Sequence, residues 1–126
     1  MKKKTDRKKL IEKLDKIFSL YIRLRDNGVC YTCGKVGDIK SMQAGHYISR
    51  SCMALRWHEA NVHCQCYSCN VCKHGDLITY RERLIDEFGE EYIIGMEKER
   101  HTTVKYKIEE LQELIDIYQE ELDKLQ

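Results

Sequence analysis

Two short cysteine turns constrain the fold of this chain more than any other feature. Cys30 and Cys33 form a Cys-x-x-Cys-Gly sequence, and Cys66 and Cys69 form a second Cys-x-x-Cys sequence further along the chain. Two such turns at this separation are typical of a site in which four thiolates hold one zinc ion in a tetrahedron. We therefore expect Cys30, Cys33, Cys66 and Cys69 to bind one structural zinc ion, with no coordination position left open for chemistry.

The second cysteine run also permits other interpretations. Cys72 forms an overlapping pair with Cys69, and a redox dithiol or packed thiols are the alternatives that we rank below zinc. We favour Cys66 with Cys69 because the helical pattern resumes soon after them, and a helix N-terminus favours thiolates. Cys52, Cys64 and Cys72 would then be spare thiols. The odd total of seven cysteines, with no secretory signal, indicates the reducing cytoplasm rather than a disulfide framework.

The composition indicates one small domain. Burial of its apolar side chains alone would stabilise that domain only weakly. The chain has 126 residues, 34% of them charged, and its apolar runs are far shorter than the roughly 18 residues that span a bilayer. Residues 1–25 carry ten Lys or Arg and three Asp or Glu, whereas residues 83–126 carry six and thirteen. We therefore divide the single domain into a basic N-terminal helix (1–26), a zinc-bound module (27–88) and an acidic helical region (89–126).

Hydrophobic periodicity predicts an α+β protein with long helices at both ends. The predicted helices cover residues 5–25, 77–88, 90–99 and 104–125, and the best strand candidates are 40–48 and 54–58. The last helix has an unbroken apolar seam. That seam would pack either on the N-terminal helix of the same chain or on a second copy in a dimer, and the pattern alone does not decide between them.

Polar residues interleaved with the cysteines form a candidate catalytic set. His46 lies at the end of a predicted strand. Asn70 and His74 are four residues apart, so we expect them to share one face of a first helical turn. An amide oxygen and an imidazole placed in this way could hold a divalent cation opposite His46. Several basic side chains flank these positions and would neutralise DNA phosphates: Arg50, Arg56, Lys73 and Arg81.

Three sequence runs carry a resemblance to a known family: Gln43 to Tyr47, Leu55 to His63, and Gln65 to Gly75 followed by Tyr80-Arg81. Together they resemble the His-Asn-His (ββα-metal) nuclease motif in a treble-clef zinc frame, similar to phage endonuclease VII. They resemble the phage NinG/Rap recombination proteins more closely, over roughly residues 20–90. The resemblance implies a zinc-stapled ββα-metal module that cleaves branched DNA, such as Holliday junctions and D-loops, during phage recombination in the cytoplasm of the bacterial host.

The same resemblance assigns a role to each polar residue. His46 would be the general base that activates water, Asn61 would brace the opposite loop, and Asn70 would ligate Mg²⁺ or Mn²⁺, with His74 as a second ligand. Phosphodiester hydrolysis needs a proton acceptor with a pKa near neutrality and a cation that stabilises charge on the phosphorane. We expect the product to carry a 5′-phosphate.

One position departs from the wider nuclease class. Many of its members carry an acid or a histidine directly before the base, where this chain has Gly45. The replacement ligand would be His74, Asp38, Gln43 or water.

The alternative function is a non-catalytic zinc-binding DNA adaptor, which would need the cysteines and the basic residues but not His46. An enzyme that cuts opposing strands would most simply be a homodimer, formed through the terminal helices.

Overall fold

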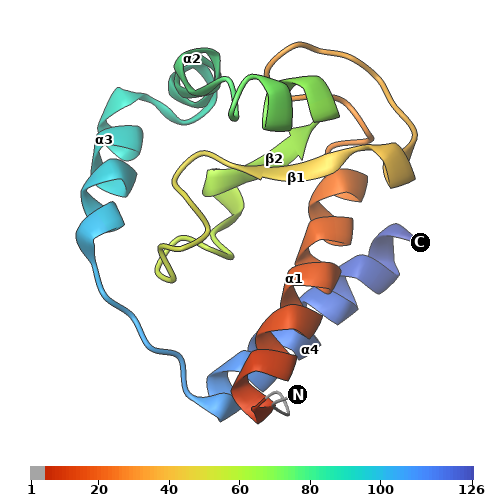
Figure 1. The fold of residues 1–126 in the computed structure, drawn as a ribbon, viewed down its shortest axis with the longest axis vertical. Coiled ribbons are helices and arrows are strands. Elements are labelled where there is room, and N and C mark those ends of the chain that lie inside the picture. Colours follow the sequence, from red (N-terminus) through yellow and green to blue (C-terminus); the bar gives the residue numbers. More distant parts are fainter. Residues whose placement is uncertain (1–4) are drawn as a thin grey trace.

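A small two-stranded sheet lies between two pairs of helices in the computed structural model, which describes residues 5–126 (Figure 1). The helices and strands are α1 (Asp6–Arg25), β1 (Gln43–His46), β2 (Val62–Gln65), a π-helical turn (Ser68–Cys72), α2 (Leu77–Phe88), α3 (Glu90–Lys98) and α4 (Ile108–Leu125). This arrangement confirms the predicted α+β class. Within the described part of the chain, no helix is both long enough and apolar enough to cross a membrane.

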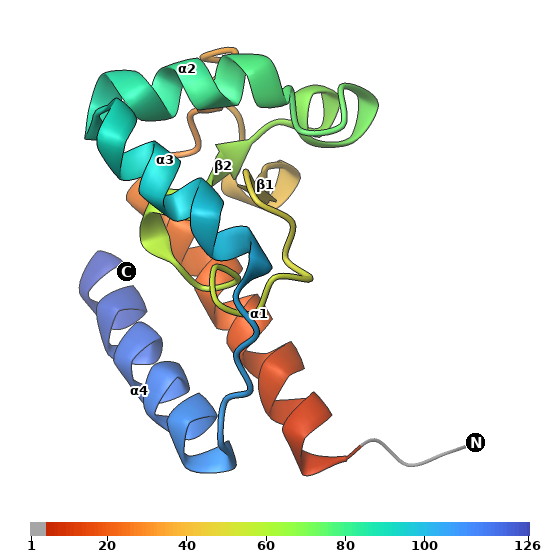
Figure 2. The same ribbon diagram turned by 90° about the vertical axis from the view of Figure 1, so that its left-hand side faces the viewer.

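Helices α1 and α4 pack side by side, as Figures 1 and 2 both show. The buried face of α1, which includes Leu14 and Phe18, meets Leu111 and Tyr118 of α4 in one apolar cluster. The apolar seam of α4 is therefore buried against α1 of the same chain. The sequence placed the start of α4 at residue 104, but the helix begins at Ile108 because the Glu110 side chain accepts a hydrogen bond from the Lys107 amide and caps it there.

Strands β1 and β2 form an antiparallel hairpin in which His46 pairs with Val62. The first predicted strand, 40–48, contains β1, but the second, 54–58, is wrong: this segment forms turns, and the real partner strand follows it. Leu55 and Trp57 alternate with polar residues because they enter two separate apolar clusters, not because they line one face of a sheet. All four residues of β2 are buried, so it shows no alternation.

Helices α2 and α3 cover the opposite side of the hairpin (Figure 2). Both lie where the sequence predicts them, and Gly89, at φ +90°, ends the first and precedes the second. Tyr80 and Leu84 of α2 are fully buried in a cluster with Leu55 and with Ile93 of α3. The hairpin thus lies between two apolar clusters. A third cluster, made mostly of cysteines, lies where β1 begins and β2 ends.

Candidate functional site

The four predicted cysteines converge. Their sulfur atoms all lie within 4.8 Å of one another. In a zinc tetrahedron the edge is about 1.6 times the Zn–S distance of about 2.3 Å, so neighbouring sulfurs should be about 3.8 Å apart. Cys33 Sγ and Cys66 Sγ are 3.7 Å apart. The thiols of Cys30, Cys33, Cys66 and Cys69 could therefore hold one zinc ion.

Local backbone geometry explains how each turn aims its two thiols. Gly34, at φ +80°, closes the first turn by donating its amide hydrogen to the Cys30 carbonyl at 2.9 Å. In the second turn the Cys69 amide lies 3.5 Å from Cys66 Sγ and donates to it. The helix expected directly after Cys69 is only the π-helical turn, and α2 begins later, at Leu77.

The remaining cysteines stay outside this cluster. The Cys72 thiol is not among the four that converge, so the geometry selects the pair formed by Cys66 and Cys69 over the overlapping pair with Cys72. Cys64 lies beside the cluster on β2, and burial raises the pKa of its thiol to about 11. Cys64 is not one of the four thiols that converge.

A pocket of about 370 Å³ brings His46 and Asn70 together. Its lining comes from α1, from β1, from the loop between the strands and from the π-helical turn: Asp15, Phe18, Ser19, Ala44, His46, Arg50, Arg56, Trp57 and Asn70. Helix α1 thus forms one wall of the pocket, which we did not predict from the sequence.

His46 presents one unprotonated nitrogen. Its Nε2 lies 2.9 Å from the carbonyl oxygen of Arg56, and because a carbonyl can only accept, Nε2 carries the hydrogen. Burial lowers the pKa of His46, against the effects of that hydrogen bond and of the Asp15 charge. The ring is therefore neutral at pH 7, and Nδ1 is the nitrogen that can take up a proton.

Asn61 is fully buried and is not among the residues that line the pocket. Its Oδ1 accepts from the Ile48 amide at 2.8 Å, and its Nδ2 donates to the carbonyls of Ile48 and Leu55 at 3.0 and 3.1 Å. The side chain thereby ties together two parts of the loop between the strands. This geometry fits the bracing role that the family resemblance implies.

Asn70 is oriented by Gln43, whose Oε1 accepts from Asn70 Nδ2 at 2.6 Å. The Asn70 Oδ1 remains as the oxygen suited to a cation. The expected helical face shared with His74 is wrong, because His74 follows the π-helical turn with a left-handed backbone (φ +52°) and is exposed. Of the replacements expected for an acid at position 45, neither His74 nor Asp38 is among the residues that line the pocket, whereas Gln43 contacts Asn70.

The fold itself excludes an acid at position 45. A Cβ on Gly45 would lie 1.8 Å from Oε1 of Gln65. Gln65 is fully buried and cannot give way easily, because its Nε2 donates to Thr32 Oγ1 at 3.1 Å and to the Gly75 carbonyl at 2.8 Å. The space that an acidic side chain would need is therefore filled by the side chain that links the hairpin to the cysteine turns.

The four expected DNA-binding side chains do not form one row. Arg50 is exposed and lines the pocket, and Lys73 is exposed just beyond the π-helical turn. The Arg56 guanidinium is bound to Asp15. Arg81 lies on α2 away from the pocket, with its Nε 2.7 Å from Oε2 of Glu97. The structure thus corrects the placement expected for Arg81.

Asp15 is the lining residue that sequence reasoning missed. It contacts Arg56 and Trp57, which are more than forty positions away in the sequence, so no local motif reveals it. A signal was nevertheless present. Asp15 lies four residues after Ile11 and three before Phe18, so a carboxylate stands at the edge of the apolar stripe of α1.

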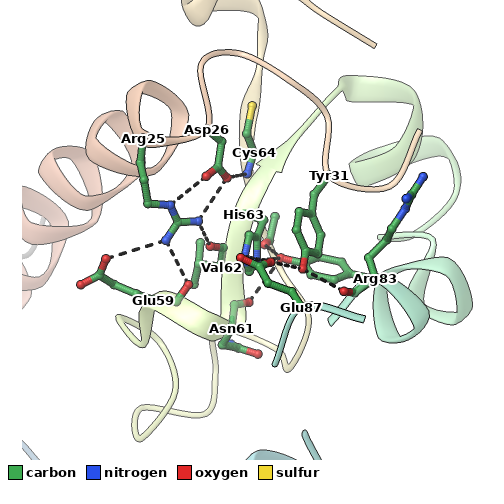
Figure 3. A network of polar contacts seen from close by, with 12 residues as sticks. Arg25, Asp26, Tyr31, Glu59, Asn61, Val62, His63, Cys64, Arg83 and Glu87 are labelled. Carbon is green, nitrogen blue, oxygen red and sulfur yellow. Dashed lines mark hydrogen bonds and ion pairs between the residues drawn. The ribbon is translucent and has the colours of Figure 1, made fainter. Parts of the chain in front are cut away.

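A second polar network fixes the hairpin from its other side (Figure 3). Arg25, at the end of α1, donates to the Val62 carbonyl, while His63 stacks on Tyr31 with ring centroids 3.8 Å apart. The Tyr80 hydroxyl donates to the Gly45 carbonyl, so at His63 it accepts from Nδ1. The network therefore places a hydrogen on Nδ1 of His63.

Acid should weaken the fold through His63. Burial, together with the nearby Arg25 cation, lowers the pKa of His63 from 6.5 to about 4. The neutral His63 ring makes its full contribution to the free energy of unfolding above pH 6.5. That contribution is lost as the pH falls towards 4, because in this range the histidine takes up a proton readily only in the unfolded chain. The loss is on the order of 3 kcal/mol. Urea unfolding at several pH values should show that the free energy of unfolding changes less with pH in His63→Phe than in wild type. Equal changes in the two proteins would contradict this role of His63.

The fold and the thiol cluster define a class: small α+β proteins in which a four-cysteine cluster that could hold zinc joins a two-stranded hairpin to flanking helices. The whole chain, residues 1–126, matches the family described as Bacteriophage Lambda NinG protein, and it belongs to that family. This confirms the resemblance seen in the sequence.

Curated relatives agree with this assignment. The chain is 33% identical over 117 residues to Protein ninG of Escherichia phage lambda, covering 91% of this chain and 56% of the relative. It is 32% identical to Protein ninG of Salmonella phage P22 over 117 residues (91% and 57%), and 35% identical to that of Enterobacteria phage H19B over 103 residues (79% and 50%). The chain thus spans about half the length of these relatives. No solved structure matches it.

Proposed function

We propose that this chain is a metal-dependent DNA endonuclease that hydrolyses phosphodiester bonds in branched recombination intermediates, such as Holliday junctions and D-loops, in the cytoplasm of the phage's host. The observation that carries the proposal is the pocket that His46 and Asn70 both line, because it brings an imidazole and a carboxamide to one cavity. Such a pair can serve proton transfer and cation binding at the same phosphate.

The residues of the pocket divide the chemistry between them. His46 Nδ1 takes the proton from a water molecule as that water attacks the phosphorus atom. Asn70 Oδ1, oriented by Gln43, is the side-chain oxygen that would hold Mg²⁺ or Mn²⁺. The bound ion would stabilise charge on the phosphorane and on the leaving 3′ oxygen. Arg50, at the pocket, attracts the DNA phosphates, and the product carries a 5′-phosphate.

The branched substrate and the assembly state belong to the same proposal and are supported by the family. The exposed Arg50 and Lys73 would bind the backbone whatever the base sequence, which agrees with recognition of DNA shape. Cutting opposing strands of a junction would need two copies of the pocket, most simply in a homodimer. The α1–α4 seam is already buried within one chain, so such a dimer would use the outer faces of the terminal helices.

The second candidate is a DNA-binding adaptor that does not cut. One observation favours it: Gly45 leaves no room for an acidic ligand directly before His46. Such a protein would keep the thiol cluster and bind branched DNA, but metal ions would cause no cleavage.

The deciding experiment is cleavage of labelled duplex, flap and four-way junction DNA by zinc-loaded protein with Mg²⁺ or Mn²⁺. We expect cleavage of the branched substrates, and a loss of about 10²- to 10⁴-fold in rate for His46→Ala, because that variant lacks the proton acceptor. His101→Ala, in an exposed turn outside the pocket, is the matched control and should cut like wild type. Junction binding without any cleavage would select the adaptor instead.

A further inference from the structure

We infer that Asp15 is a positioning residue for His46: from α1 it holds Arg56 and Trp57 in place, and so fixes the Arg56 carbonyl that orients the imidazole. This inference rests on the proposed function, since it assigns to α1 a part in the same site. It also accounts for the wall that α1 contributes to the pocket.

The contacts of Asp15 reach two successive residues of the loop between the strands. Its Oδ1 accepts from Arg56 Nε at 3.0 Å and from Trp57 Nε1 at 2.9 Å, and its Oδ2 accepts from Arg56 Nη2 at 2.5 Å. The guanidinium is thus bound by both carboxylate oxygens, which is the strongest geometry for such a pair. With three donors already engaged, the carboxylate is a poor candidate for the missing cation ligand.

The same loop segment carries the group that orients the base. The Arg56 carbonyl accepts from His46 Nε2 at 2.9 Å. Residues 49–58 form only turns, so no ladder of backbone hydrogen bonds holds this carbonyl as a sheet would. Asn61 ties the loop at Ile48 and Leu55, and Asp15 adds the attachment to α1 on the next two residues.

Losing this attachment would alter the imidazole in a specific way. If the Arg56 carbonyl moves away, its hydrogen bond no longer stabilises the Nε2–H tautomer, and the population of the tautomer with the hydrogen on Nδ1 rises. Such a ring cannot take a proton from water at Nδ1. The charged groups that face His46 are Asp15 from α1 and Arg50 and Arg56 from the loop, so removing the Asp15 charge also lowers the pKa of His46 further.

The test uses Asp15→Asn in the full chain, with Asp86→Asn on the exposed face of α2 as the matched control. Two readouts are needed: the pH profile of junction cleavage, and the tautomer and pKa of His46 from ¹⁵N-resolved NMR of the imidazole. We expect Asp15→Asn to lower kcat by about 10- to 100-fold, as is typical of groups that orient a reacting residue, with KM for the junction unchanged. NMR should show the Nδ1–H tautomer appearing.

A second variant guards against a simple folding defect. Trp57→Phe removes one donor to Asp15 and keeps an aromatic ring in the core, so it should shift the same tautomer equilibrium to a smaller extent. The inference is overturned if the His46 tautomer is unchanged in Asp15→Asn. It is also overturned if that variant only raises the Mn²⁺ requirement, which would make Asp15 a cation ligand. The NMR readout does not depend on cleavage, so it tests Asp15 even if wild type fails to cut DNA.

Discussion

Removing the zinc is expected to unfold the chain. Structural zinc sites of this kind contribute about 10–16 kcal/mol, as much as the whole stability of a typical small domain. The cluster that would hold the ion contains only Met42 besides its cysteines, and it joins the first cysteine turn to β2. Cys66→Ser or treatment with a chelator should therefore abolish the thermal unfolding transition seen by circular dichroism, together with the bound zinc measured by native mass spectrometry.

A matched cysteine variant separates zinc binding from a general effect of losing a thiol. Cys72 is exposed and lies outside the cluster, so Cys72→Ser should keep one zinc per chain and the wild-type melting curve. Retention of both zinc and fold by Cys66→Ser would contradict the assignment. Loss of zinc in Cys72→Ser would instead point to the overlapping cysteine pair.

Phe18→Ala should cost about 3–5 kcal/mol, the usual loss for deleting a buried aromatic ring. Phe18 is 2% exposed and meets Tyr118 of α4 edge to face, with ring centroids 4.8 Å apart. It lies in the buried seam that joins the two terminal helices. Urea unfolding should show a lower midpoint for the variant, and because the seam lies within one chain, that midpoint should not depend on protein concentration.

The control for this prediction lies on the same pair of helices. Ile117 of α4 is 52% exposed and faces away from the seam, so Ile117→Ala should change the free energy of unfolding by no more than about 0.5 kcal/mol. An equal effect of the two substitutions, or a midpoint for Phe18→Ala that rises with concentration, would show that the seam is an interface between copies.

The helices and the thiol cluster could be predicted from the sequence because their signals are local. A 3.6-residue apolar period marks α1 and α4, and a fixed Cys-x-x-Cys spacing marks each turn. The choice of Cys66 over Cys72 depended on where the helix resumes. That reasoning selected the pair whose thiols converge with those of Cys30 and Cys33, although Cys69 lies within a π-helical turn and α2 begins only at Leu77.

The turns at residues 54–58, the position of His74 and the role of Asp15 could not be predicted from the sequence, each for a physical reason. The alternation from residue 54 to 58 looked like a strand, but it arises from Leu55 and Trp57 pointing into separate clusters. His74 was expected on a helical face, which the left-handed backbone at that residue removes. Asp15 enters the pocket only through tertiary packing of α1, and no spacing rule brings together residues that distant in sequence.

The central claim is that His46 moves the proton and Asn70 holds the cation at one phosphate. Its most direct test is a Mn²⁺ titration of junction cleavage by zinc-loaded wild type, His46→Ala and Asn70→Ala. We expect wild type to cut, His46→Ala to remain nearly inactive at every Mn²⁺ concentration, and Asn70→Ala to recover activity as Mn²⁺ is raised. Failure of wild type to cut at any Mn²⁺ concentration, or three identical titration curves, would contradict the claim.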